Sequence, residues 1–244
     1  IIRQNKFVKF LFVNLYQYNI MNLTLDIGNT QAKLAVFDDK LLEIKCFDSK
    51  YIHDNINDFL KLFPLIKNLI VCSVIDTDLN FDSYNFQNIH FVSNTSKLPF
   101  INLYNTKRSL GNDRIALVSR AAIKFSNQNV LIIDAGSSIT YDFINKNNQY
   151  LGGAISPGLK MRFKSLNHYT SNLPLVKSLT ESIDIGKTTY DSISNGVCSG
   201  VNYEIEGFID QYSSKYKNLT VILTGGDSDF LSKRLKISIF ANQN

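Results

Sequence analysis

Short apolar runs alternate with polar segments along this chain from Asn22 onward. Runs rich in β-branched residues predict strands, and apolar residues three or four positions apart predict helices. The predicted strands are Asn22–Ile27, Lys33–Phe37, Leu41–Phe47, Asn68–Val74, Ile89–Ser93, Val130–Asp134, Ile139–Ile144, Tyr150–Ile155 and Thr220–Thr224. Because helices alternate with these strands, the pattern indicates an α/β fold with mixed sheets.

The helical pattern is clearest where apolar residues recur between turn signals. The predicted helices are Asp54–Phe63, a short one within Asp76–Asn88, one opening at Gly111, Gly158–Asn167, Thr188–Ser214, and a final one after Asp227. Glycine weakens a helix interior, so a break is expected near Gly200. A polar stretch, Asn94–Ser109, carries the chain from the first half to the second.

The second half of the chain repeats the opening of the first. Each copy is a strand, an Asp-x-Gly turn and a returning strand, and the two turns read Asp26-Ile27-Gly28-Asn29-Thr30 and Asp134-Ala135-Gly136-Ser137-Ser138. An internal duplication of this kind predicts two related halves, each supplying a similar wall to a shared cleft. We expect one domain over residues 21–105 and a second over 106–244.

Composition narrows the class of protein. The net charge of +5 comes from lysines spread along the chain without a dense basic block, which is typical of a solvated surface and gives no support for nucleic-acid binding. The three cysteines and three histidines are far apart, and no CxxC pair occurs: Cys46, Cys72, Cys198, His53, His90, His168. Buried free thiols in a reducing compartment are therefore expected, and nothing indicates a zinc site.

The first twenty residues are basic and then apolar. Their apolar run is interrupted by Asn14, Gln17 and Asn19, and no small-residue cleavage site follows, so a signal peptide is not indicated. The run is also too short and polar to span a bilayer, and we expect no membrane association. Because Met21 directly precedes a strand, our hypothesis is that translation starts there and that residues 1–20 are an extension outside the core.

The Asp-x-Gly turns are suited to binding phosphate. Glycine lets the backbone approach an anion, and successive N–H groups form an anion nest. Asp26 would repel phosphate unless a Mg²⁺ ion lay between them, and Lys33 can add positive charge for the transferred group. The alternative is that such turns simply close hairpins, and for one turn alone that interpretation is at least as good. Two matched copies favour the phosphate site.

Two further segments carry candidate chemistry. In Leu223-Thr224-Gly225-Gly226-Asp227 a strand runs into paired glycines, which can lie against a base and sugar, although an ordinary turn fits equally well. Asp113 stands in the first turn of a helix beside Arg114. A carboxylate there can accept a proton from a hydroxyl nucleophile, while the guanidinium holds an acidic group. From this pair alone, Asp113 as a simple helix cap is the better interpretation.

The segments taken together resemble a known family. They are Asp26-Ile27-Gly28-Asn29-Thr30 with Lys33, Gly111-Asn112-Asp113-Arg114, Asp134-Ala135-Gly136-Ser137-Ser138-Ile139-Thr140, Gly152-Gly153-Ala154-Ile155-Ser156-Pro157-Gly158, Gly186-Lys187-Thr188-Thr189 with Gly196, and Thr224-Gly225-Gly226. In this order they resemble the type III pantothenate kinases, which belong to the ATPase superfamily of actin, sugar kinases and Hsp70. The resemblance covers nearly all of the chain from Met21. Its Gly-x-Asp-Arg and Gly-Gly-x-Ile-x-Pro-Gly segments are fairly specific to the family, whereas the Asp-x-Gly turns indicate only the superfamily.

The resemblance implies a fold and an activity. The fold is two ribonuclease H-like halves of the actin-like ATPase type with a nucleotide cleft between them. The activity is ATP-dependent phosphorylation of the primary hydroxyl of pantothenate to 4'-phosphopantothenate, the first step toward coenzyme A. Mg²⁺, a monovalent cation (K⁺ or NH₄⁺), a homodimer and a cytoplasmic location are implied as well.

The resemblance also implies residue roles. By this resemblance, Asp113 matches the family's proton acceptor. The family's substrate contacts match Tyr104, Gly111, Asn112, Asp113, Arg114 and Thr189. The nucleotide contacts match Asp26, Ile27, Gly28, Asn29, Thr30, Gln31, Ala32, Lys33, Ser137, Gly225 and Gly226. Asp134 matches the monovalent-cation ligand, and Asp26 is the second expected metal contact. Ser137-Ser138 departs from the more common Thr-Ala and keeps one hydroxyl.

Three alternatives stay open at this point. A non-catalytic regulatory relative with an accessory role in transcription should have lost Asp113 or the first turn, and both are intact. An actin-like filament former should lack the Gly-x-Asp-Arg segment. A different kinase or phosphatase of the superfamily would act on acetate, a sugar or polyphosphate, and a panel of acceptors separates it from a pantothenate kinase.

Overall fold

The computed structural model describes residues 20–28, 31–75, 79–177 and 185–236. The expected extension over residues 1–20 therefore lies outside the described residues except for its last position. The described chain forms two compact units, one ending at Lys124 and the other beginning at Phe125. The helix that carries Asp113 groups with the first unit, whereas the sequence placed it after the boundary. The boundaries 21–105 and 106–244 stay a prediction.

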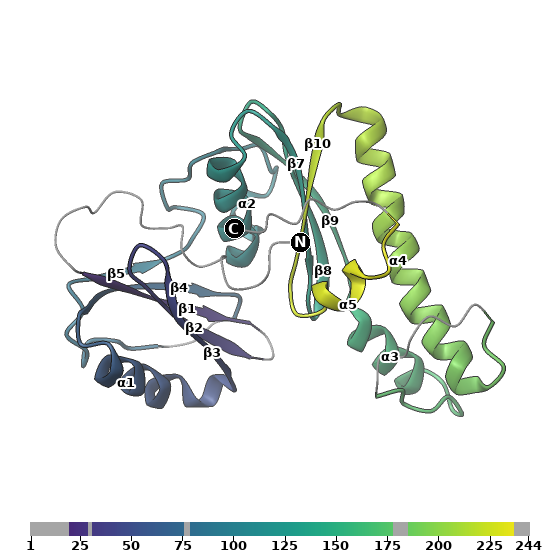
Figure 1. Ribbon diagram of the computed structural model, residues 1–244, viewed down its shortest axis with the longest axis horizontal. Coiled ribbons are helices and arrows are strands. Elements are labelled where there is room, and N and C mark those ends of the chain that lie inside the picture. Colours follow the sequence, from purple (N-terminus) through teal and green to yellow (C-terminus); the bar gives the residue numbers. More distant parts are fainter. Residues whose placement is uncertain (1–19, 29–30, 76–78, 178–184, 237–244) are drawn as a thin grey trace. The chain divides into compact units, whose positions relative to one another are not determined.

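The first unit is built on a mixed sheet with strand order β3-β2-β1-β4-β5 (Figure 1). Its elements are β1 (Met21–Ile27), β2 (Ala32–Phe37), β3 (Leu41–Phe47), α1 (Ile52–Leu62), β4 (Ile66–Ser73), β5 (Asn88–Phe91), β6 (Ile101–Asn102) and α2 (Asn112–Lys124), with 3₁₀ turns at Ser49–Tyr51 and Lys107–Ser109. Strands β1, β2 and β3 are antiparallel, and β4 and β5 continue parallel to β1. Alternate residues of β1 and β2 pack with α1 in one core, for example Leu25 with Ile56 and Phe59.

The second unit repeats this plan. Its elements are β7 (Asn129–Ala135), β8 (Ser138–Ile144), β9 (Gln149–Pro157), α3 (Leu159–His168), α4 (Thr189–Lys215), β10 (Leu219–Thr224) and α5 (Ser228–Ser232). Its strands follow the order β10-β7-β8-β9, with β7, β8 and β9 antiparallel and β10 parallel to β7. This matches β4-β1-β2-β3 of the first unit strand for strand. The predicted α/β fold with two related ribonuclease H-like halves is confirmed.

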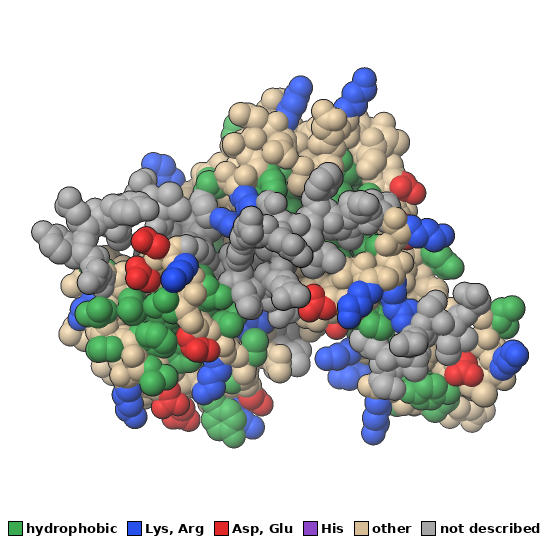
Figure 2. Space-filling view, in the orientation of Figure 1, with side chains coloured by type: hydrophobic (Ala, Val, Ile, Leu, Met, Phe, Trp, Pro, Cys, Tyr) green, Lys and Arg blue, Asp and Glu red, His purple; other side chains and the backbone are tan. Residues whose placement is uncertain are grey.

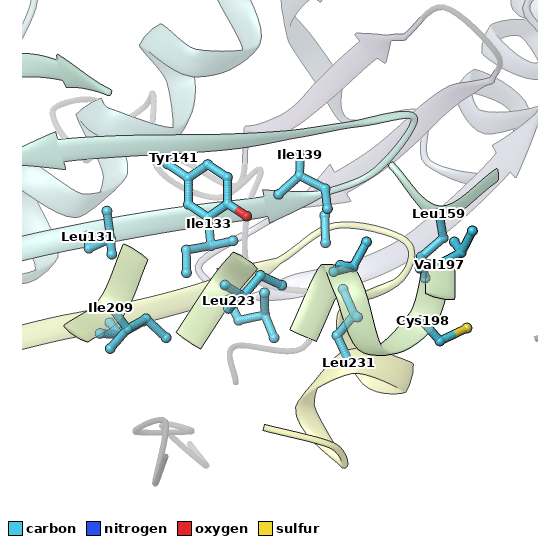
Figure 3. Close-up of a cluster of buried hydrophobic side chains, with 14 of the residues drawn as sticks. Leu131, Ile133, Ile139, Tyr141, Leu159, Val197, Cys198, Ile209, Leu223 and Leu231 are labelled. Atoms are coloured by element: carbon cyan, nitrogen blue, oxygen red, sulfur yellow. The ribbon is translucent and has the colours of Figure 1, made fainter. Parts of the chain in front are cut away.

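One face of the second sheet holds the larger core. Leu131 and Ile133 of β7 and Tyr141 of β8 lie on this face with side chains from α4 and β10 (Figure 3). Val197, Val201 and Ile205 are buried on one side of α4, and this apolar side fixes how the helix packs on the sheet. Apolar burial on this scale is what holds the turn-bearing ends of the strands in place.

Two predicted features are wrong. Residues 79–87 contain no helix, and residues 76–78 lie outside the described part of the chain. Here the Asn80 side chain accepts the Asp82 N–H in a local turn at 2.7 Å, and Phe81 enters the core instead of extending a helix. The break near Gly200 is also absent, because α4 runs unbroken for 27 residues and its buried face outweighs the weak helix propensity of glycine. The short strand β6 was not predicted.

The surface agrees with the scattered charge of the sequence. On the face shown in Figure 2, basic side chains are dispersed among acidic and apolar ones. No helix within the described ranges combines the length and the apolar character that crossing a membrane requires.

Candidate active site

The first Asp-x-Gly turn connects β1 to β2. Asp26 is the second-to-last residue of β1, Ile27 is buried, and the Gly28 N–H donates to the Gln31 carbonyl at 3.0 Å to close the turn. Asn29 and Thr30, both expected to contact nucleotide, lie outside the described residues. Gln31 is exposed and Ala32 is buried as the first residue of β2. The loop therefore begins and ends on well-anchored strands.

Strand register places three functional groups in one row. Lys33 on β2 is the antiparallel partner of Asp26, and Cys72 on β4 is its parallel partner. Side chains of residues directly opposite each other project from the same face of a sheet. Burial raises the pKa of the Asp26 carboxyl, Lys33 opposes that rise, and the negative charge of Asp113 adds to it. Asp113 is thus close enough to Asp26 for their charges to interact.

The same cluster perturbs Cys72. Burial raises the pKa of its thiol well above the usual value, and the charges of Asp26 and Asp113 raise it further. Cys72 is only 7% exposed, so it is an uncharged, inert neighbour of the two carboxylates. The expectation of buried thiols holds for Cys72 and Cys198 and is wrong for Cys46, which is exposed. Sequence reasoning did not place Cys72 in this cluster, because it stands within an apolar run and only strand register brings it beside Asp26.

Helix α2 begins at the end of β4. The Asn112 amide donates to the Ser73 carbonyl at 3.0 Å, and Ser73 is the register partner of Ile27. The Ile115 N–H bonds the Gly111 carbonyl at 3.1 Å, so Gly111 lies at the N-cap and Asp113 lies inside the first turn. The bond from Asn112 to Ser73 ties the start of α2 to β4, the strand that pairs with β1 and its Asp26.

Asp113 stands inside the first turn of α2 and is not its N-cap. Its carboxylate accepts the Arg114 N–H at 2.8 Å, which is the amide of the next residue, whereas an N-cap side chain bonds two or three residues ahead. A Cβ on Gly111 would stand 2.5 Å from the Asp113 Oδ1 atom, so glycine leaves the room that this carboxylate occupies. Together with its effect on Asp26, this supports a role toward the turn between β1 and β2.

Arg114 and Tyr104 form a second pair beside this cluster. Arg114 is 5% exposed, and its guanidinium carbon lies 5.6 Å from the centre of the Tyr104 ring. A guanidinium stacked on an aromatic face keeps its charge and a fixed direction. The structure therefore brings together two of the residues expected to contact the substrate.

The second Asp-x-Gly turn connects β7 to β8 in the other unit. Asp134 is opposite Thr140 on β8, and the Gly136 N–H donates to the Ser138 carbonyl at 3.0 Å. The Ser137 carbonyl accepts the Gly158 N–H at 3.1 Å, which joins this turn to the start of α3. The turn is thus packed against the junction of β9 and α3 within its own unit.

The paired glycines lie directly on this second turn. Gly225 has a φ of +95°, and a Cβ on it would stand 2.3 Å from the Ala135 carbonyl and 2.4 Å from the Asp134 Oδ1 atom. The Asp227 N–H donates to the Ala135 carbonyl at 2.9 Å. Burial raises the pKa of the Asp227 carboxyl, against the effect of Lys160. The structure thus packs Gly225 on the Asp134–Ala135 end of β7, while the predicted roles of Asp134, Ser137, Gly225 and Gly226 stay predictions.

Thr189 opens α4 and is exposed. The preceding Thr188 caps the helix, and its hydroxyl accepts the Asp191 N–H at 3.1 Å. The Thr188 hydroxyl thus serves as the helix cap, whereas the Thr189 side chain lies at the surface of its unit.

The residues present are compatible with a divalent cation that arrives with the nucleotide. Within the described ranges no cluster of three or more His, Cys, Asp or Glu residues could hold a metal by itself. Asp26 and Asp113 nevertheless put two carboxylates near each other with Lys33 as the opposing charge. Because Mg²⁺ in phosphoryl-transfer sites uses one or two carboxylates plus phosphate oxygens and water, this donor set fits it.

Comparison with known proteins decides the family. The sequence model of the family described as type III pantothenate kinase matches residues 22–211. The chain belongs to the type III pantothenate kinase family. A type III pantothenate kinase of Flavobacterium johnsoniae is 47% identical over 92% of this chain and 93% of its own length. One from Bacteroides fragilis is 41% identical over 91% and 93% of the two chains.

A solved structure adds a likeness at the level of the fold. A conserved protein from Campylobacter jejuni, described as a proposed Baf family transcriptional activator, is 25% identical, covers 88% of each chain and has a TM-score of 0.56. Membership in the pantothenate kinase family confirms the predicted resemblance and the class of enzyme, a kinase. The predicted roles of single residues stay predictions.

Proposed function

We propose that this chain transfers the γ-phosphoryl group of ATP to the primary hydroxyl of pantothenate, the first step of coenzyme A biosynthesis. Two kinds of support meet here. The family match extends over most of the chain, and its relatives carry this activity in their names. The observation that carries the proposal is the cluster of Asp26 at the end of β1, Lys33 at the start of β2 and Asp113 in the first turn of α2.

Asp113 is the proton acceptor in this proposal. A carboxylate accepts the proton of the attacking hydroxyl as phosphoryl transfer proceeds, and it must stay ionised to do so. The Arg114 N–H at 2.8 Å stabilises the charged form of this carboxylate. The start of α2 also contributes partial positive charge at the same place.

Arg114 binds the carboxylate end of pantothenate. Its guanidinium can offer two parallel N–H donors to a carboxylate, which a lysine cannot do. The Tyr104 ring lies beside that guanidinium, with its centre 5.6 Å from the guanidinium carbon. Gly111 and Asn112 are the neighbouring substrate contacts in this proposal. Thr189 is the further substrate contact that we propose, on the strength of its place in the Gly-x-Thr-Thr segment.

The residues from Asp26 to Lys33 bind the triphosphate. Gly28 lets the backbone approach the phosphates, and Lys33 provides a positive charge on the same face as Asp26. Asp26 would hold Mg²⁺ together with phosphate oxygens. When bound, the ion neutralises charge on the transferred group.

The second turn binds the rest of the nucleotide. Ser137 supplies a hydroxyl, and Gly225 and Gly226 present backbone without side chains. Asp134 is the proposed ligand of a monovalent cation, K⁺ or NH₄⁺, beside the Ala135 carbonyl. We also propose a homodimer and action in the cytoplasm, where reduced thiols such as Cys46, Cys72 and Cys198 persist.

A panel of acceptors tests the proposal. The purified protein is supplied with ATP, Mg²⁺ and K⁺, and ADP release is followed with pantothenate, acetate, a hexose and polyphosphate. We expect turnover with pantothenate alone and a product that carries one phosphate at its primary hydroxyl. Turnover restricted to another acceptor, or none at all with intact folded protein, would reject the proposal.

A further inference from the structure

One carboxylate in the second unit collects hydrogen bonds from three other elements. Glu204 of α4 accepts through Oε1 from the Tyr141 hydroxyl of β8 at 2.8 Å and from the Ser156 hydroxyl of β9 at 2.5 Å. Through Oε2 it accepts from Arg162 Nη2 of α3 at 2.5 Å. Figure 3 shows Tyr141 among the core side chains on the face toward α4. The arrangement fixes α3 and the end of β9 to the long helix.

Arg162 extends this link to the backbone. Its Nε donates to the Pro157 carbonyl at 2.8 Å, and its own N–H donates to the Gly158 carbonyl at 3.0 Å. The side chains of Arg162 and Glu204 are 22% and 24% exposed, so their ion pair is largely shielded from water. A shielded, charge-assisted pair holds its geometry better than an exposed one.

The bend at Pro157 and Gly158 lies directly on the second Asp-x-Gly turn. The Gly158 N–H bonds the Ser137 carbonyl at 3.1 Å. A Cβ on Gly158 would stand 2.2 Å from the Gly136 carbonyl oxygen and 2.6 Å from that of Ser137. Backbone therefore packs on backbone with no slack, and a shift of the bend must displace the turn.

We propose that Glu204 is a positioning residue for nucleotide binding. Through Arg162 it holds the bend at Pro157 and Gly158 against the Gly136–Ser137 turn, and so keeps that turn in its binding shape. The inference rests on the proposed function, in which Ser137 contacts the nucleotide. Without the carboxylate, the Arg162 charge is left partly buried and unpaired, so the guanidinium turns toward water and releases the Pro157 carbonyl.

The charge state of Glu204 suits this role. Burial by itself would raise the pKa of its carboxyl, but hydrogen bonds from Arg162, Ser156 and Tyr141, with the charge of Arg162, bring it below the usual value. The carboxylate is therefore ionised throughout the neutral range, and the pair with Arg162 persists there.

Binding of Mg·ATP to purified variants, measured by isothermal titration calorimetry, tests the inference. Glu204→Gln should raise the Kd for Mg·ATP about tenfold, and Ser156→Ala, which removes one donor to the same carboxylate, about two- to threefold. Asp210→Asn is the matched control, because it removes one exposed carboxylate from the same helix. Its Kd should stay within about twofold of the wild type.

Steady-state kinetics separate positioning from a merely structural effect. Glu204→Gln should raise the KM for ATP and leave the KM for pantothenate unchanged. A fall in Vmax with both KM values unchanged would show only loss of folded protein. An equal rise in both KM values would show a general disturbance of binding. Either result would overturn the inference. If Glu204→Gln does not fold, Ser156→Ala decides, and unaltered ATP binding in that folded variant overturns the inference.

ATP binding and phosphorylation of pantothenate, measured side by side, distinguish failure of this inference from failure of the proposed function. ATP binding that weakens in Glu204→Gln, without any phosphorylation of pantothenate, would reject the proposed function and leave this inference standing. A wild-type protein that does not bind Mg·ATP would reject the nucleotide role of the Ser137 turn and, with it, the role of Glu204.

Discussion

Gly225→Ala tests how closely the paired glycines pack on the second turn. Gly225 has a φ of +95°, and the new Cβ would stand 2.3 Å from the Ala135 carbonyl oxygen and 2.4 Å from the Asp134 Oδ1 atom. A left-handed backbone costs an L-residue roughly 1–2 kcal/mol. Overpacking against backbone that cannot rotate away adds about 1–3 kcal/mol. We therefore expect the free energy of unfolding to fall by about 2–5 kcal/mol.

The assay is thermal and urea unfolding of Gly225→Ala beside the wild type. A loss of this size lowers Tm by about 5–15 °C for a unit of this size. Gly207→Ala is the matched control, since Gly207 lies within α4 and a Cβ there meets nothing within 4 Å. Because alanine favours a helix more than glycine does, the free energy of unfolding of Gly207→Ala should rise by roughly 0.5–1 kcal/mol.

The comparison of the two alanine variants can refute this reasoning. If Gly225→Ala unfolds at the wild-type temperature, the close approach of Gly225 to the Asp134–Ala135 backbone is wrong. If both variants lose stability equally, the loss reflects glycine replacement in general and says nothing about this turn. Weaker Mg·ATP binding in a folded Gly225→Ala would additionally link the packing to the nucleotide.

Three further predictions concern Asp113, the cation proposed at Asp134, and Glu204. Asp113→Asn should lower kcat by about 10²–10⁴-fold while Mg·ATP binding in calorimetry stays within a few-fold, and near-normal kcat would remove the base role. Replacing K⁺ with Na⁺ should slow turnover if Asp134 holds a monovalent cation, and an unchanged rate in the ADP-release assay would count against that site. The pKa of Glu204 is lower in the folded protein than its usual value of about 4.5. The stability that its pair with Arg162 contributes is therefore fully present above about pH 4.5 and is lost as the pH falls through the folded-state pKa. Acid should therefore destabilise the wild type more than Glu204→Gln in urea titrations at pH 7 and pH 3, and equal losses would contradict the assignment.

Much of the fold could be predicted because its signals are local. The apolar runs around Leu25 and Ile133 define strands, and an Asp-x-Gly turn between two such runs defines a hairpin. The repeat of that hairpin then indicates two related halves. The failed helix within Asp76–Asn88 shows the limit, since Asn80 and Asp82 prefer a local turn and Phe81 is drawn into the core.

The assembly of the candidate site could be predicted only in part. A carboxylate beside a glycine turn is visible in the sequence, and so is Asp113 next to Arg114. The position of Cys72 opposite Asp26 depends on strand register, and the Asn112 bond to Ser73 depends on how α2 meets β4. Such contacts join residues far apart in the chain, and no local pattern encodes them.

Asp113 and Arg114 are consecutive residues of one helix, and this spacing restricts what they can serve. The Cα–Cβ bonds of adjacent residues on an α-helix diverge by about 100° around its axis, so the two side chains leave the helix in different directions rather than toward one point. They instead suit an elongated molecule with an alcohol at one terminus and an acid at the other. Under the proposed function, acetate offers a carboxylate for the Arg114 guanidinium but no alcohol proton for the Asp113 carboxylate to accept.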